Sequence, residues 1–320
     1  CGFSSLSDPQ HLSKMNYPEL VKLLQCPVSG RPLTWTGKML LEEGSGRQYK
    51  EVDGIIDLVV EEEKNLDLGD AGHYDHHPFE FFDWTPEQLS GSAIEEELKE
   101  FLRKIPNNAV ICDVGCGAGR VSAFLEYQGF TRALAFDYSA RSLAIVRKHT
   151  QLPVIRANNL CLPLKSTSVD VLISTGVIHH TPNPLKALRE NCRVLRSGGW
   201  MYLKIYRYGG YYHFIHLFIG GFMRFLVNRG KVGKVLVEKA FFEFYKILSR
   251  IIKPGRTKKD AHLRALFHDY FLNPQTRFVR PGIIAKVLYS ENMRFVLKKT
   301  QRPTNLYLIQ NTELKTLYNY

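Results

Sequence analysis

Residues 111–120 read ICDVGCGAGR, and this stretch decides the fold. A short apolar run ends in Asp113, glycines follow at positions 115, 117 and 119, and a helical pattern begins at Arg120. Glycine lets the backbone turn tightly and approach a ligand closely, and the N-terminus of a helix offers free N–H donors. The stretch therefore predicts a strand, a turn and a helix that together cradle a nucleotide cofactor.

The spacing of the glycines distinguishes between cofactors. A dinucleotide fingerprint is G-x-G-x-x-G, whereas here the third glycine comes one residue early and Arg120 takes its place. The carboxylate of Asp113, just before the first turn, would also oppose a pyrophosphate. A positively charged ligand suits this turn better than a dinucleotide.

From residue 108 to residue 206, short β-branched runs alternate with amphipathic segments. Each crossover helix must return over a face of the sheet, so this alternation predicts a doubly wound, mostly parallel α/β core. The expected elements are 109–114, 120–128, 133–136, 140–149, 153–157, 169–174, 184–195 and 200–206.

Four motifs in this core resemble those of class I S-adenosylmethionine-dependent methyltransferases, in particular the small-molecule type 11 group. The glycine turn matches D-x-G-x-G-x-G, and residues 154–164 (VIRANNLCLPL) match x-D-A-x-x-L-P-F with Asn158 in place of the acid. Residues 168–180 (SVDVLISTGVIHH) and 193–199 (RVLRSGG) match the segments at the fourth strand and before the fifth. A further strand, within 133–139, ends in Asp137, about 20 residues after the glycines, where an acid can accept both ribose hydroxyls.

The resemblance implies a Rossmann-like, seven-stranded sheet that binds S-adenosyl-L-methionine, releases S-adenosyl-L-homocysteine and uses no metal. An amide oxygen at Asn158 can still accept a hydrogen bond from the adenine amino group. The expected cofactor-binding residues are Asp113, Gly115, Cys116, Gly117, Gly119, Asp137, Tyr138, Asn158, Asn159, Leu160 and Thr175.

The flanking sequence suggests five segments. Residues 1–65 resemble a small α+β Trm112-like module, in which Ser29 stands where a zinc-binding C-P-x-C motif has its second cysteine. We therefore expect this module to bind no zinc. The other segments are an acidic bridge with lid helices (66–107), the cofactor-binding core (108–206), a helical insertion after strand five (207–279), and a helix with closing strands (280–320).

Composition and charge indicate the cellular compartment and the kinds of partner that the chain can attract. Six cysteines among 320 residues include no C-x-x-C pair, which favours a reducing compartment and a cytoplasmic protein. The longest apolar stretch, 211–227, is interrupted by histidines, glycines and Arg224, so we do not expect it to span a membrane.

Residues 42–102 hold 18 acids and 4 bases, and residues 200–303 hold 5 acids and 21 bases. The basic part can attract acidic ligands, lipid headgroups or nucleic acid, or dock against the acidic part.

Methyl transfer requires an aligned acceptor and, for oxygen or nitrogen acceptors, a group that takes a proton. His179 and His180 follow the fourth strand, at the edge where such sheets bind substrates, although the pair could also cap the next helix. The candidate bases are His179, His180 and His268. The candidate substrate-binding residues are Tyr74, Tyr206, Tyr208, Tyr211, Tyr212 and His213.

Residues 72–84 (GHYDHHPFEFFDW) gather three histidines and an aspartate, which could form a metal site or a lid. His73 and His77 are not part of a helical pattern, and no distant partner cluster accompanies them, so we favour the lid, with Tyr74 over the pocket.

Three functions remain open. The aromatic residues of the insertion occur at helical spacing and favour a lid over a small, hydrophobic acceptor, and the lysines and arginines beside them are compatible with contact with a membrane surface. An RNA methyltransferase is the second reading, supported by the basic C-terminal third but by no RNA-binding motif. A scaffold that has lost catalysis is the third, and the intact acids and glycines argue against it.

Overall fold

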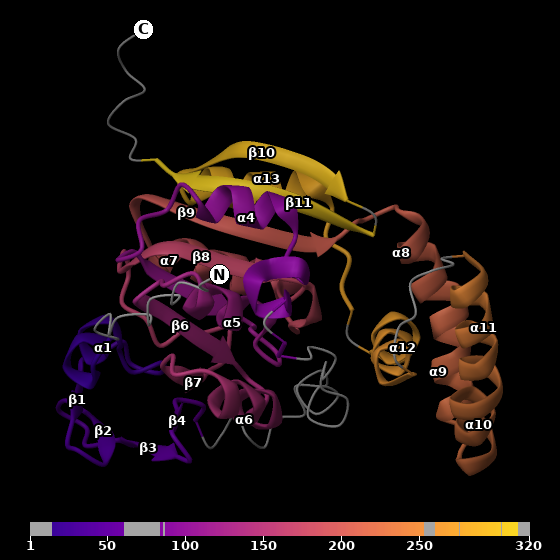
Figure 1. The fold of residues 1–320 in the computed structure, drawn as a ribbon, viewed down its shortest axis with the longest axis horizontal. Helices are drawn as coiled ribbons and strands as arrows, with labels where there is room; N and C mark the ends of the chain where they lie inside the picture. Colours follow the sequence, from indigo (N-terminus) through magenta and orange to yellow (C-terminus); the bar gives the residue numbers. More distant parts are fainter. Residues whose placement is uncertain are drawn as a thin grey trace, which may run out of the picture.

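A computed structural model describes residues 15–60, 84–85, 87–252, 260–274, 276–301 and 303–312. Tyr74 and the rest of segment 72–83 lie outside these ranges, so the expected lid and the metal alternative stay untested. Figure 1 shows a central twisted sheet with a small N-terminal module on its left and a helical insertion on its right.

The central strands are β5 (Val110–Val114), β6 (Arg132–Asp137), β7 (Val154–Arg156), β8 (Val169–Thr175) and β9 (Leu195–Tyr206). They run parallel in the order β7-β6-β5-β8-β9, and β11 (Thr304–Asn311) and β10 (Met293–Gln301) then add antiparallel strands next to β9. All five residues of β5 are buried, as expected for a parallel strand covered on both faces. The predicted Rossmann-like α/β fold is confirmed.

Helices cover both faces of this sheet. Side chains alternate along β5, so that Ile111 packs with α4 (Glu96–Leu102) and α5 (Arg120–Tyr127). Its neighbours Val110 and Cys112 pack on the other face, with α7 (Pro184–Val194) and α13 (Pro281–Ser290). The remaining helix of the core, α6 (Ala140–His149), covers the same face as α5 through Leu143 and Val146.

The expected count of seven strands is too low for the whole sheet. The N-terminal module comprises α1 (Tyr17–Leu23), β1 (Leu33–Trp35), β2 (Met39–Glu42), β3 (Gln48–Val52) and β4 (Ile55–Asp57). Its last strand pairs in parallel with β7, with Ile56 opposite Ile155, and Asp57 forms an ion pair with Arg156 at 3.2 Å. The module therefore continues the seven-stranded sheet of the core, giving eleven strands among the described residues.

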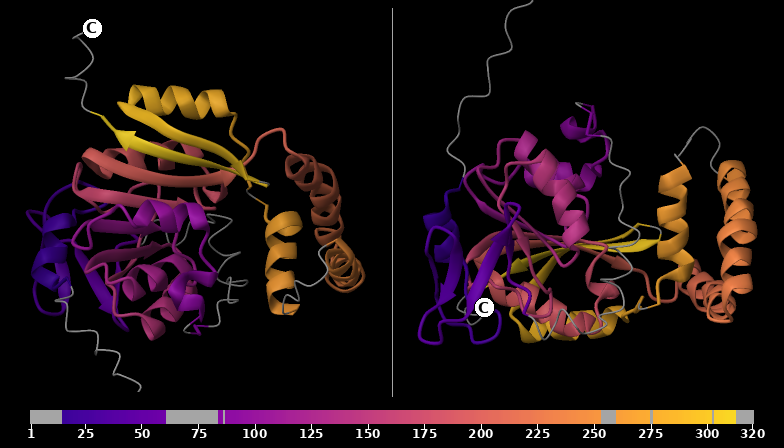
Figure 2. Two further views of the ribbon diagram at one scale, coloured as in Figure 1. Left: turned by 45° about the horizontal axis from the view of Figure 1, so that its top comes forward. Right: turned by 90° about the horizontal axis from the view of Figure 1, so that it is seen from below.

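The helical insertion leaves the end of β9 and has a core of its own. It runs through α8 (Tyr211–Ile215), η3 (His216–Gly220), α9 (Gly221–Val227), α10 (Lys231–Val235), η4 (Leu236–Phe241), α11 (Phe242–Ile252), α12 (Asp260–Phe267) and η5 (His268–Leu272). Met223, Val237, Phe242, Leu263 and Phe267 are buried together inside it. Figure 2 shows α12 on the side nearer the sheet, with the other helices beyond it. Within the described ranges, no helix is long and apolar enough to cross a bilayer.

Candidate active site

The glycine turn joins β5 to α5 with a left-handed backbone. Gly115, Gly117 and Gly119 have φ angles of 77°, 53° and 88°, a region that favours glycine. A methyl group added to Gly115 would lie 2.3 Å from a methyl of Val177, whereas one added to Gly117 would meet nothing within 4 Å. Gly115 is therefore required by packing against protein, and Gly117 keeps its surface open on the cavity side.

A second acid fastens this turn to the neighbouring strand. The backbone N–H of Gly117 donates to Oδ2 of Asp137 at 2.8 Å, and the N–H of Ser139 donates to Oδ1 at 2.9 Å. Asp137 ends β6, and Ser139 caps α6 by accepting a hydrogen bond from the N–H of Ser142. The carboxylate thus stands between two turns at the carboxyl edge of the sheet.

The first acid is deeply buried. Asp113 is 2% exposed, and its Oδ2 accepts a hydrogen bond from the Ser122 hydroxyl at 2.7 Å. Burial raises the pKa of Asp113 to about 6, although the bond from Ser122 lowers it. A positive group placed beside this side chain would stabilise its ionised form.

The segment after β7 supplies two amides. Asn158 accepts a hydrogen bond from the N–H of Leu160 at 2.9 Å and so fixes its own turn. Both polar atoms of the Asn159 side chain are buried without a hydrogen-bond partner among the described residues, although the residue lines the cavity. Such a buried, unsatisfied amide is costly unless a ligand completes its bonds.

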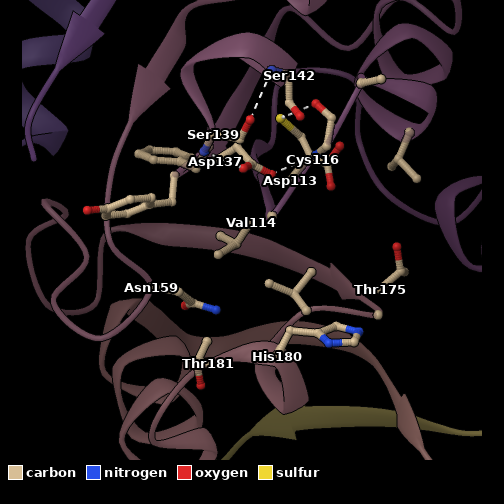
Figure 3. Close-up of a pocket in the computed structure, with 18 of the residues that line it drawn as sticks. Asp113, Val114, Cys116, Asp137, Ser139, Ser142, Asn159, Thr175, His180 and Thr181 are labelled. Atoms are coloured by element: carbon tan, nitrogen blue, oxygen red, sulfur yellow. Dashed lines mark hydrogen bonds between the residues drawn. The ribbon is translucent and has the colours of Figure 1, made fainter. Parts of the chain in front are cut away.

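These groups surround a cavity of about 360 Å³. Figure 3 shows Asp113 and Asp137 on one side of it and His180 and Thr181 on the opposite side. Of the expected cofactor-binding residues, those that line the cavity are Asp113, Gly115, Cys116, Gly117, Asp137, Tyr138, Asn158, Asn159 and Thr175. Gly119 and Leu160 do not line it. Gly119 packs against Val146, and Leu160 packs against the core.

The donor set fits S-adenosylmethionine. Two carboxylates face a cavity that a sulfonium and an ammonium group would enter, the open side of Gly117 permits close approach, and the unsatisfied Asn159 amide can bond a base. A dinucleotide would instead bring a pyrophosphate toward Asp113 and Asp137. The observations that favour the adenosyl cofactor are the charge of the cavity and the spacing of its glycines.

Residues 112–203 match the family described as "Methyltransferase domain". This stretch is a class I S-adenosylmethionine-dependent methyltransferase domain. It contains the glycine turn, Asp137, the two asparagines and most of the parallel strands.

The curated relatives match about a third of the chain. Over 112 residues the chain is 31% identical to the probable tRNA methyltransferase 9B of Bos taurus, a match that covers 34% of this chain and 24% of that protein. Over 120 residues it is 33% identical to an uncharacterized chloroplastic methyltransferase of Arabidopsis thaliana, and the match covers 34% of each. The chain thus spans only a quarter to a third of these relatives.

Among solved structures, a SAM-dependent methyltransferase from Aquifex aeolicus is 13% identical, with a TM-score of 0.41. The likeness covers 78% of this chain and all of that one.

On the far side of the cavity, the methyltransferase domain meets the insertion through a buried polar cluster. His180 is 7% exposed, its Nε2 lies 3.4 Å from Oδ1 of Asp269, and its Nδ1 lies 3.0 Å from Nδ2 of Asn273. The hydroxyl of Tyr206 donates to Oδ2 of Asp269. When the Asn273 amide donates to Nδ1, His180 carries its proton on Nε2, toward Asp269. His180, Tyr206 and Asp269 all line the cavity.

The other two candidate bases lie outside the cavity wall. His179 is 1% exposed, its Nδ1 accepts from the N–H of Tyr206 at 3.4 Å, and burial lowers its pKa well below the usual range. It therefore stays neutral and packs behind Tyr206. His268 bonds Glu238 at 3.2 Å within the insertion, and its neighbour Asp269 faces the cavity instead.

Among the described residues that we expected in the acceptor pocket, Tyr206 alone lines the cavity. Tyr212 is buried behind it, with ring centroids 4.5 Å apart. The Tyr208 ring lies tilted against that of His213, and its hydroxyl accepts a hydrogen bond from Arg280. Tyr211 is exposed at a separate small depression. These four residues support the wall or lie outside it, and Tyr74 lies outside the described residues.

The insertion supplies three wall residues, namely Leu266, Asp269 and Tyr270. The sequence indicates Asp269 and Tyr270 as positions that suit an acceptor pocket, and the structure adds Leu266. All three come from α12 and η5, about 60 residues after the strand that carries Tyr206. The signal in the sequence is the His-Asp-Tyr run at 268–270, which closes the insertion. The sequence does not indicate which of these three side chains faces the cavity.

Proposed function

We propose that this chain transfers a methyl group from S-adenosylmethionine to an oxygen, nitrogen or carbon atom of a small, hydrophobic metabolite. The observation that carries the proposal is the wall opposite the cofactor motifs, where the largely apolar side chains of Pro182, Tyr206, Leu266 and Tyr270 line the cavity together with one carboxylate, Asp269. An apolar wall with a single polar cluster is typical of sites that bind small molecules.

When bound, S-adenosylmethionine supplies a methyl group on a positively charged sulfur, which needs no further activation. The acids at positions 113 and 137 hold the positive charge and the ribose end on one side of the cavity. The aromatic wall positions an acceptor on the other side and excludes water. In this proposal the acceptor atom lies between the two.

The proton acceptor we assign is Asp269. Its two oxygens are oriented by Tyr206 and His180, and it is itself 4% exposed. His180 has Nδ1 engaged by Asn273, so its role in this geometry is to position the carboxylate. An acceptor hydroxyl or amine bound against this cluster would pass its proton to Asp269 as the new bond to carbon forms.

Methylation of tRNA is the second candidate. The curated relative in Bos taurus is named as a probable tRNA methyltransferase, and 21 of the 26 charged residues between 200 and 303 are basic. Both features favour an anionic substrate. The cluster of exposed bases on the insertion would then lie along the nucleic acid.

Transfer of tritium-labelled methyl groups tests the two candidates. The full chain is incubated with labelled S-adenosylmethionine and, in separate tubes, with an organic extract of cellular metabolites or with total tRNA. Label in the organic extract, lost in the Asp137→Ala variant, is the expected result. Label in tRNA alone would replace the proposal by the second candidate, and label in neither would contradict both.

A further inference from the structure

The insertion leaves an unusually large apolar surface exposed. Of the 21 large hydrophobic side chains exposed in the described part of the chain, 14 lie between residues 211 and 251. Among them, Phe218 is 71% exposed and Ile251 is 69% exposed. Scattered hydrophobic side chains are normal on a surface, but a concentration of this kind marks an interaction site.

These side chains follow helical spacing on two helices. On α8 to α9 they fall at positions 214, 218, 222 and 225, and on α11 at 244, 247, 248 and 251. We call these eight residues the outer face. On the same helices Met223 and Phe242 point into the core of the insertion, so the outer face is the side opposite to that core. In Figures 1 and 2, α12 lies between the sheet and these helices, which leaves their far side uncovered by the described residues.

Positive charge accompanies the outer face. Between residues 207 and 252 there are eight bases and two acids. Four exposed bases, Arg229, Lys231, Lys234 and Lys239, lie at and just after the turn between α9 and η4. Both acids are engaged, since Glu238 pairs with Arg264 and Glu243 pairs with Lys246. The surface beside the apolar side chains is therefore strongly cationic.

We infer that the outer face docks on an anionic phospholipid surface. Exposed phenylalanine and aliphatic side chains next to lysine and arginine are the pattern of helices that lie in the headgroup region of a bilayer, and no described helix is fit to cross it. The aliphatic members, such as Ile247 and Ile251, offer nothing for a nucleic-acid base to stack on, which favours lipid over RNA.

Docking there would tether the methyltransferase domain to the lipid surface through the insertion. The insertion that bears the outer face also supplies Leu266, Asp269 and Tyr270 to the cavity wall. The docking itself is independent of the proposed methyl transfer.

Vesicle flotation tests the inference with the full chain. The vesicles are phosphatidylcholine alone or phosphatidylcholine mixed with phosphatidylglycerol. We expect the chain to float with the anionic vesicles about tenfold more strongly than with the neutral ones, and we expect added salt to weaken this binding. Failure to float with anionic vesicles would overturn the inference.

Three variants separate the contributions. Phe218→Ser/Phe222→Ser/Ile251→Ser is expected to weaken binding to anionic vesicles at least about tenfold. Lys231→Glu/Lys234→Glu should remove the preference for anionic vesicles. Tyr289→Ser, at an exposed position on α13, is the matched control and should bind as the unmodified chain does.

Thermal unfolding of each variant verifies folding, because the replaced side chains are exposed and their loss should leave the midpoint unchanged. Unweakened binding by the triple serine variant would overturn the inference. So would self-association in sedimentation that depends on the outer face and occurs without vesicle binding, since a second copy of the chain would then cover it.

Discussion

The backbone N–H of Gly117 donates a hydrogen bond of 2.8 Å to the carboxylate of Asp137, which ends the neighbouring strand. This bond ties the glycine turn after β5 to the acid after β6, so the two motifs form one rigid edge of the cavity. Asp137 thereby shapes the turn, and the same residue lines the cavity.

Alanine at Gly117 should affect binding more than folding. The residue has a φ of 53° and open space around its α-carbon, so we expect Gly117→Ala to cost about 1 kcal/mol of unfolding free energy through backbone strain. The added methyl group would occupy cavity space, and the affinity for S-adenosylmethionine should fall at least about tenfold. Chemical denaturation and calorimetric titration measure the two quantities.

Gly115→Ala is the matched comparison. Its methyl group would lie 2.3 Å from Val177, and the φ of 77° is also unfavourable for alanine. We expect a loss of about 3 kcal/mol of unfolding free energy from strain and overpacking. Equal stability of the two alanine variants would show that the turn is packed differently from the structure described.

The buried acid predicts a pH dependence of stability. Burial raises the pKa of Asp113 from 3.8 to about 6 in the folded state. The folded chain binds the Asp113 proton more tightly than the unfolded chain does, so protonation of Asp113 stabilises the fold. This contribution to the free energy of unfolding is fully present below about pH 4 and is lost as the pH rises through 6, a change of about 3 kcal/mol. The unfolding free energy of Asp113→Asn, relative to the unmodified chain, should therefore increase by about that amount between pH 4 and pH 7. If the difference in unfolding free energy between the two proteins did not change with pH, burial would not raise the pKa of Asp113.

Asp269→Asn tests the assignment of the proton acceptor. For an oxygen or nitrogen acceptor we expect methyl transfer to slow about 100-fold or more, because the amide cannot take the proton. The affinity for S-adenosylmethionine should stay unchanged, since the cofactor motifs lie across the cavity. Transfer rates and calorimetric titration are compared with those of the exposed control Tyr289→Ser. Undiminished transfer by Asp269→Asn would remove the role assigned to this carboxylate.

The fold could be predicted from sequence largely because local patterns decide it. The buried runs around 110–114 and 169–175 can only be covered on both faces, and the glycine turn is determined by its own residues. Helix boundaries were less predictable. The apolar spacing of residues 93–105 predicts a helix there, with Ser92 as its N-cap. Instead α4 begins at Glu96 with Glu95 before it, because residues 88–92 form a separate helical turn.

Long-range pairings explain most of what the sequence did not predict. The pairing of β4 with β7 joins residues about 100 positions apart, and the sequence of neither strand indicates its partner. The cavity wall has the same origin, since Asp269 reaches Tyr206 across 63 positions only after the insertion has folded. Cofactor motifs lie at strand ends and so could be recognised, whereas the acceptor side depends on how the insertion packs.

Every role assigned to the cavity depends on its binding S-adenosylmethionine. Calorimetric titration with S-adenosylmethionine, S-adenosylhomocysteine and NAD, on the unmodified chain and on Asp137→Ala, measures this binding. We predict saturable binding of both adenosyl compounds, loss of that binding in Asp137→Ala, and no binding of NAD. Absence of adenosyl binding by the unmodified chain, or equal binding by Asp137→Ala, would contradict the account.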